Sequence, residues 1–258
     1  MLQPRIIVSL LLQEDELIKT KKFKNPQYIG DPINTVKIFN EKKVDELSIF
    51  DIGATRNNIE PNYNLIEQIA AQSRMPVCYG GGIKNAAQAQ KIFNLGIEKI
   101  ALSSAIFQVP NIIETISEKV GAQSVVAVLD IKKNLWGGYD VFINNGKTQV
   151  KDNLLSILAM LEKNGVGEIV INHIDNDGTG KGYDFNLIEK VSKQISKPLT
   201  VLGGAGSLED IKQLFKHFGI IGAAAGSLFV FKGRYNAVLI NYPDAETKNT
   251  LYNIDYAN

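Results

Sequence analysis

Few residues that build metal centres, disulfides or membrane spans occur in this chain. Its 258 residues include one cysteine, Cys78, and two histidines. A lone cysteine cannot form an internal disulfide, and so few soft ligands argue against a zinc site. No apolar run reaches the roughly 18 residues of a membrane span, and the run at 6–12 has the length of a strand. We therefore expect no metal, no cofactor and no contact with a membrane.

Net charge is also nearly absent. Twenty-eight basic and 27 acidic side chains give +1, so no long-range field favours nucleic acid or an anionic surface. The first residues lack the basic, apolar and small-residue segments of a signal peptide. With 45% hydrophobic residues, the composition is that of a globular protein, and we expect it in the cytoplasm. The length fits one large α/β domain or two smaller ones.

Eight short apolar runs alternate with segments of helical period. Asp31-Pro32 and Ser207 have the residue types of helix N-caps, and each precedes such a segment. Continuous apolar strands separated by helices are typical of a parallel sheet that is buried on both faces. Eight units in this length predict a (β/α)8 TIM barrel, with a doubly wound sheet as the alternative. The expected strands are Arg5–Leu11, Leu47–Ile52, Val77–Tyr79, Lys99–Leu102, Val125–Ile131, Glu168–Asn172, Leu199–Leu202 and Gly222–Ala225.

An internal repeat favours the barrel. Three blocks recur in the same order at a nearly constant spacing, which indicates two similar half-barrels. No Ser/Pro-rich linker interrupts the chain, so we predict one domain over residues 1–258. The paired blocks are Phe50–Thr55 with Ile174–Thr179, Gly80–Gly82 with Gly203–Gly204, and Ser104–Phe107 with Gly226–Phe229.

The glycine and serine blocks follow expected strands. All strand ends of this kind lie on one face of a barrel, where free backbone amides can bind phosphate. The repeat therefore predicts two phosphate sites on that face, although glycines that only permit tight turns remain the alternative. The first site would include Gly82, Ser103 and Ser104, and the second Gly204, Gly226 and Ser227.

Four aspartates, Asp51, Asp130, Asp175 and Asp177, stand at or just after expected strand ends. A carboxylate there is a candidate general acid or base, or else a helix cap. Asp130 is the sharpest candidate because it ends an apolar run, where burial would shift its protonation. Asp177 begins the sequence Asp-Gly-Thr, which is either a ligand-binding loop or a plain turn.

A series of short motifs runs in order along the chain: Arg5-Ile6-Ile7, Lys19, Gly30-Asp31-Pro32, Asp45-Glu46-Leu47, Phe50-Asp51-Ile52, Gly80-Gly81-Gly82-Ile83, Asp130, Asp175-Asn176-Asp177-Gly178-Thr179, Gly182-Tyr183-Asp184 and Gly203-Gly204-Ala205-Gly206. With these motifs the chain resembles the cyclase subunit of imidazole glycerol phosphate synthase, the HisF family, over nearly its whole length. The resemblance implies a barrel of two halves that binds a bisphosphorylated substrate, with Asp130, Asp177 and Lys19 as catalytic residues. It adds Asp51, Gly178 and Thr179 to the expected phosphate-site residues.

Four charged residues, Arg5, Glu46, Lys99 and Glu168, stand at the starts of expected strands and should ring the bottom of the barrel. In the family that this chain resembles, such a ring gates ammonia that a docked glutaminase subunit delivers through the barrel. The resemblance therefore implies a glutaminase partner at the bottom. The alternative is an ion-pair network that closes the floor and contributes little stability.

One position departs from the family pattern. The family has a catalytic aspartate at the end of its first strand, in a Cys-Leu-Asp sequence, and this chain has Ser9-Leu10-Leu11. Losing a general acid or base lowers a rate about 10²–10⁴-fold. The triplet and several other segments are similar to a paralogue branch that serves surface-polysaccharide biosynthesis. There a separate sugar amidotransferase converts an acetamido group to an acetamidino group.

Three other interpretations stay open. The chain could be a histidine-pathway cyclase, a phosphosugar isomerase of the sister half-barrel family, or a scaffold that conducts ammonia without catalysis. The first loop, with Lys19, Lys21, Lys22 and Lys24, either clamps a phosphate or is a solvated loop. His173, at a strand end, is as compatible with a structural role as with a catalytic one.

Overall fold

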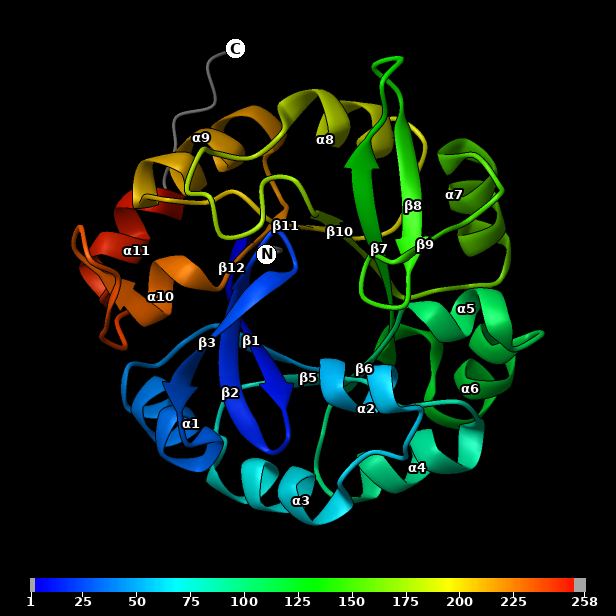
Figure 1. The fold of residues 1–258 in the computed structure, drawn as a ribbon, viewed down its shortest axis with the longest axis horizontal. Helices are drawn as coiled ribbons and strands as arrows, with labels where there is room; N and C mark the ends of the chain where they lie inside the picture. The colour runs from blue at the N-terminus through cyan, green and yellow to red at the C-terminus, as the bar shows by residue number, and fades with distance from the viewer. Residues whose placement is uncertain (1–2, 253–258) are drawn as a thin grey trace.

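Eight parallel strands form a closed barrel in the computed structural model, which describes residues 3–252 (Figure 1). The sheet closes because the strand that begins at Glu168 has parallel neighbours on both edges. One edge pairs with the strand that begins at Val125, and the other pairs with the strand that begins at Leu199. This confirms the (β/α)8 barrel. The barrel strands are β1 (Arg5–Gln13), β4 (Glu46–Asp51), β5 (Val77–Gly80), β6 (Lys99–Leu102), β7 (Val125–Lys133), β10 (Glu168–His173), β11 (Leu199–Leu202) and β12 (Gly222–Ala225).

The helices form an outer ring around these strands, as Figure 1 shows. The expected N-caps are confirmed: the Asp31 carboxylate accepts from the Asn34 amide at 2.8 Å, and Ser207 forms a capping box with Asp210. The longer helices are α1 (Pro32–Glu41), α3 (Tyr63–Gln72), α4 (Ala86–Asn94), α6 (Ile112–Val120), α7 (Leu154–Lys163), α8 (Phe185–Ser192), α9 (Leu208–Phe218) and α11 (Ala245–Tyr252). Shorter ones are α2 (Ile52–Asn57), α5 (Ser104–Gln108), α10 (Ser227–Val230) and the 3₁₀ turn Ala122–Ser124.

Side chains alternate along each barrel strand between two cores. The larger core lies between barrel and helices and includes fully buried residues such as Phe39, Ile49 and Phe215. A smaller core fills the barrel interior. Because of this alternation, only every second residue of a barrel strand points into the barrel interior. The interior core consists of Ile7, Cys78, Ala101, Val126, Val128, Val170, Leu202 and Ala224.

Two hairpins leave the barrel, one of them at the first loop, for which the sequence predicted no strands. Each follows the first strand of a half-barrel, β1 or β7, and pairs antiparallel with it. They meet above the barrel, since a Cβ added to Gly146 would lie 3.0 Å from Cδ2 of Phe23. The first loop is therefore an ordered hairpin. The strands are β2 (Glu16–Lys21) and β3 (Lys24–Gly30) in one hairpin, β8 (Tyr139–Ile143) and β9 (Thr148–Gln149) in the other, and β13 (Phe231–Lys232) and β14 (Ala237–Val238) near the C-terminus.

None of the helices within residues 3–252 combines the length and the apolar character that crossing a membrane requires.

Candidate functional site

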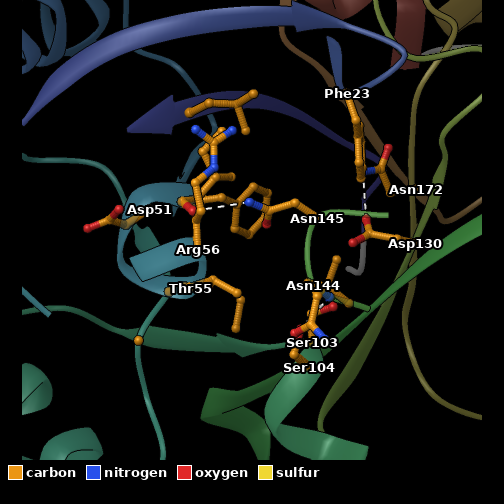
Figure 2. Close-up of a pocket in the computed structure, with 18 of the residues that line it drawn as sticks. Phe23, Asp51, Thr55, Arg56, Ser103, Ser104, Asp130, Asn144, Asn145 and Asn172 are labelled. Carbon is orange, nitrogen blue, oxygen red and sulfur yellow. Dashed lines mark hydrogen bonds between the residues drawn. The ribbon is translucent and has the colours of Figure 1, made fainter. Parts of the chain in front are cut away.

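A cavity of about 330 Å³ opens among the carboxyl ends of the barrel strands (Figure 2). We call it the mouth. Its walls come mostly from the first half-barrel and from the two hairpins. Seven of the residues that the sequence singled out line it: Lys19, Asp51, Gly82, Ser103, Ser104, Asp130 and Asp177.

Asp130 lies half-buried on β7, near the end of the part of this strand that pairs with β10, and lines the mouth. The side-chain amide of Asn172, on the neighbouring strand, donates to its Oδ1 at 2.9 Å (Figure 2). Burial raises the pKa of Asp130 to about 7, against the opposing effect of this hydrogen bond. A carboxyl group with that pKa exchanges a proton readily at neutral pH, as a general acid or base must.

Leu11 lies in the mouth where the family pattern has a carboxylate. It belongs to β1, which three strands separate from β7 in either direction around the barrel, so Leu11 and Asp130 come from opposite walls. The inward positions of β1 alternate as Ile7, Ser9 and Leu11. The mouth therefore has one acid at the end of β7 and an aliphatic side chain at the matching end of β1.

Lys19 and Asp177 form a buried ion pair, with Nζ and Oδ1 2.8 Å apart. Lys19 is 7% exposed and Asp177 is 4% exposed. The Thr20 hydroxyl donates to the second carboxylate oxygen of Asp177 at 3.4 Å, and the Lys22 amide donates to its carbonyl oxygen at 2.9 Å. Three contacts thus attach the first hairpin to the Asp177 loop, whereas the other basic residues of that hairpin, Lys21, Lys22 and Lys24, are exposed.

Asp51 is the N-cap residue of α2. Its carboxylate caps α2, accepting from the Ala54 amide at 2.8 Å, and also accepts from the Tyr79 hydroxyl at 3.3 Å. Figure 2 shows it turned away from Asp130. Burial raises its pKa, although the hydrogen bonds oppose that shift. The geometry thus fits the helix-cap interpretation of this aspartate.

The first-half phosphate residues are open to the mouth. Ser103 and Ser104 follow β6, and the Ser104 hydroxyl accepts from the backbone amide of Asn144 at 2.9 Å. Asn145 donates to the carbonyl oxygen of Ile52 at 3.2 Å, which joins the second hairpin to this side of the mouth. Sequence reasoning missed Asn144 and Asn145, because only the fold brings their turn here.

Two of the second-half phosphate residues, Gly178 and Gly226, lie close to β2. A Cβ at Gly178 would be 2.6 Å from the Thr20 carbonyl oxygen, and one at Gly226 would be 3.1 Å from Cε of Lys19. The expected pair of phosphate sites stays a prediction, but the two halves differ in access. The residues of this half that do not line the mouth are Gly178, Thr179, Gly204, Gly226 and Ser227.

Arg5, Glu46, Lys99 and Glu168 meet at the opposite end of the barrel, as expected, and we call them the floor ring. Arg5 contacts Glu46 at 2.6 Å and Glu168 at 2.8 Å, while Lys99 contacts each glutamate at 2.9 Å. Thr200 donates to Glu168 at 2.6 Å. Burial opposes ionisation of Glu168, but the two cations outweigh it and lower its pKa. The ring is thus a closed cycle of alternating charge.

A small chamber lies between the floor ring and the mouth. Its volume is about 10 Å³, close to the space that one water molecule needs. The hydroxyls of Ser9, Ser48 and Thr200 line it, and so do the inner faces of the two floor glutamates. Ser9, Phe50 and Leu202 line both the chamber and the mouth, so these side chains lie between the two spaces.

Comparisons with known proteins agree with this geometry. The family model described as histidine biosynthesis protein matches residues 5–236. A Streptococcus sanguinis protein named imidazole glycerol phosphate synthase subunit HisF is 32% identical over 251 residues, covering 97% of this chain and 96% of its own. The chain belongs to the HisF family.

Two other HisF-family relatives are more similar to this chain than the streptococcal protein is. A Vibrio vulnificus protein provisionally named imidazole glycerol phosphate synthase subunit hisF3 is 51% identical over 249 residues, which is 96% of each chain. A Pseudomonas aeruginosa protein provisionally named subunit hisF2 is 49% identical over 244 residues, covering 95% of this chain and 97% of its own. Both carry a numbered subunit name, unlike the streptococcal protein.

His173 lies outside the mouth of this HisF-family barrel. It is buried on the helix-facing side of β10, and its Nδ1 is 3.8 Å from the carboxylate of Asp184. Burial lowers its pKa. Within residues 3–252, no three His, Cys, Asp or Glu side chains form a cluster suited to a metal. The carboxyl groups that line the mouth are those of Asp51, Asp130 and Asp177.

The raised pKa of Asp130 predicts a pH dependence of stability. Between the ordinary pKa of aspartate and about 7, the folded chain binds a proton that the unfolded chain has released, so this group's contribution to stability falls as pH rises. In Asp130→Asn that contribution is absent. We expect the variant's melting temperature to exceed that of the parent at pH 8 and to converge with it near pH 4. Parallel melting curves across this range would contradict the assignment.

Proposed function

We propose that this chain is the ammonia-using synthase subunit of a glutamine amidotransferase complex. A glutaminase subunit docks at the floor ring, and ammonia passes through the chamber to the mouth. There it serves the conversion of an acetamido group to an acetamidino group on a surface-polysaccharide sugar, together with a sugar amidotransferase. Relatives named as synthase subunits support an enzyme of the lyase or cyclase type.

The observation that carries this proposal is the contrast between the two ends of the barrel. The floor ring holds four paired charges, and hydroxyls line the chamber above it. At the mouth, in contrast, Leu11 stands on the wall opposite Asp130. A barrel with a charged ring and a polar chamber at one end, and no acid on the β1 wall opposite Asp130 at the other, fits delivery of nitrogen better than ring closure, which needs proton transfer at two places.

The proposed reaction replaces a carbonyl oxygen with nitrogen. Ammonia adds to the acetamido carbon, so a C–N bond forms, the C–O bond breaks, and two hydrogens of the ammonia leave with the oxygen as water, which gives an amidine. The nitrogen becomes positively charged as it adds, and Asp130, with its pKa near 7, accepts a proton from this nitrogen.

One observation favours a second candidate, the cyclase of histidine biosynthesis. Asp130 and the Lys19–Asp177 pair both line the mouth, and these are the residues for which the family resemblance implies catalysis. The two candidates differ in their nitrogen acceptor. A product analysis with glutamine labelled with ¹⁵N at the amide distinguishes an imidazole from an amidino sugar by mass.

The floor assignment predicts a selective defect in Lys99→Glu. Reversal of this charge breaks two ion pairs and alters the surface offered to a glutaminase. We expect product formation with glutamine to fall at least tenfold, and formation with ammonium salt to fall much less, because ammonium reaches the mouth from solution.

The matched control is Lys193→Glu, which changes an exposed lysine just after α8 that pairs with Glu189 at 2.6 Å. It should leave both activities unchanged. Lys99→Met tests the same position without placing a third acid in the ring. Equal losses with both nitrogen sources in the Lys99 variants, at unchanged melting temperature, would contradict the proposed route.

A further inference from the structure

We propose that the deepest part of the mouth binds the methyl group of an acetamido substrate, with Leu11 and Phe50 as its contact surface. We call this part the methyl site, and it consists of Leu11, Phe50, Ala101, Val128 and Leu202. The inference rests on the proposed function, because it states where the acetamido group lies when ammonia arrives. The ligand class is an N-acetylated sugar, whose methyl group lies deepest in the mouth and whose hydroxyls face the rim.

The methyl site is the apolar bottom of the mouth. Ala101, Val128 and Leu202 line the mouth and also belong to the core that fills the barrel interior. Phe50 packs against that core and is half-buried. Leu11 is half-buried too, and it pairs in register with Phe50 on the neighbouring strand. Leu11 and Phe50 therefore offer adjoining apolar surface to a ligand.

The rim of the mouth is polar. Thr55, Ser103 and Asn144 surround the opening in Figure 2. A ligand with one short apolar end and a hydroxylated body matches this division. The apolar end must be small, because an eight-stranded barrel is only wide enough for side chains to fill its interior. An acetamido group has such an end, since its reacting carbon carries a single methyl group.

The position of the methyl site matches the entry of nitrogen in the proposed route. Phe50 and Leu202 line both the chamber and the mouth, so a group that packs on them lies beside the chamber. Asp130 stands on the wall opposite Leu11, and the Asn172 amide holds its Oδ1 at 2.9 Å. An acetamido carbon whose methyl contacts Leu11 would thus lie between the chamber and the acid that accepts a proton.

Leu11 has a function of its own in this arrangement. A carboxylate at this position would face the methyl group, and a charge placed against an apolar surface without a partner is unfavourable. An aliphatic side chain instead removes apolar surface of both groups from water, which is favourable. Leu11 is therefore a residue that determines specificity for an acetyl group over a formyl group.

N-methylacetamide is a suitable probe, because it contains the acetamido group without a sugar or a nitrogen donor. N-methylformamide is its matched partner and lacks only the methyl group on the carbonyl carbon. We expect titration of the whole chain with N-methylacetamide to give saturable shifts of the methyl NMR signals of Leu11 and Val128. N-methylformamide should bind about fourfold more weakly, the worth of burying one methyl group.

Leu11→Ala should remove this preference for the acetyl group, with the methyl signals of Val128 as the reporter. The matched control is Leu155→Ala, which truncates a leucine on α7 that is 44% exposed. This control should keep the preference of the parent. The methyl spectrum of each variant also shows whether the variant is folded.

Equal affinity for the two amides, or an unchanged preference in Leu11→Ala, would overturn the proposal. So would the absence of saturable shifts at the methyl site. These measurements use no ammonia and no glutaminase. If they fail while the ¹⁵N product is an amidino sugar, the proposed function stands and the methyl site is wrong. If they succeed while the ¹⁵N product is an imidazole, the proposed function is wrong and the preference of the mouth for a methyl group remains.

Discussion

Leu11→Asp should create imidazole-forming activity that the parent chain lacks or has only weakly. With the bisphosphorylated substrate of the HisF family and ammonium salt, we expect the rate to rise about 10²–10⁴-fold, the usual worth of a general acid or base. The new carboxylate would stand on the wall opposite Asp130, because β1 and β7 are equidistant around the barrel in both directions. Steady-state product formation measures the effect.

Leu11→Asn is the control, because asparagine has the size and polarity of aspartate but no carboxyl proton to transfer. This variant should form imidazole no faster than the parent. Robust imidazole formation by the unmodified chain would instead assign this protein to histidine biosynthesis. An active Leu11→Asn would mean that polarity, rather than proton transfer, limits the parent.

The barrel itself could be predicted from the sequence because its signals are local. Strands buried on both faces are continuous apolar runs, and all eight expected strands agree with the observed ones to within about two residues at each end. The caps at Asp31 and Ser207 depend on contacts three residues away. The floor ring followed from the same signals, because charged residues at strand starts must gather at one end.

The hairpins and the asymmetry of the mouth could not be predicted in this way. Five of the seven residues of β3 are exposed, so no apolar pattern marks this strand. The Lys19–Asp177 pair joins residues 158 positions apart, and its existence depends on where β2 crosses the barrel. The repeat predicts two similar halves but carries no information on which hairpin covers which half.

Glu168→Ala should lower the free energy of unfolding by about 3–5 kcal/mol, the cost of removing one partner from a buried ion pair. Glu168 is 5% exposed and accepts from Arg5, Lys99 and Thr200. Its removal would leave two cations facing Glu46 alone and would leave the Thr200 hydroxyl without its acceptor. For a chain of this length, each kcal/mol corresponds to about 2–4 °C in melting temperature.

The control is Glu189→Ala, which removes the acid of the exposed pair with Lys193 and should cost less than about 1 kcal/mol. Glu168→Gln keeps an acceptor for Thr200, so its loss of unfolding free energy should lie between those of Glu168→Ala and Glu189→Ala. If the floor ring were only a solvated surface network, Glu168→Ala and Glu189→Ala would have the same small effect.

The pH dependence of this effect has a definite sign. The pKa of Glu168 lies below its ordinary value of 4.5, so its ionised form stabilises the fold above that pH. The stabilisation is lost as pH falls below 4.5 and through the lowered pKa. The melting temperatures of parent and Glu168→Ala should therefore differ most at neutral pH and converge under acid. A difference that stayed constant from pH 7 to pH 3 would show that packing, rather than charge, holds the floor ring together.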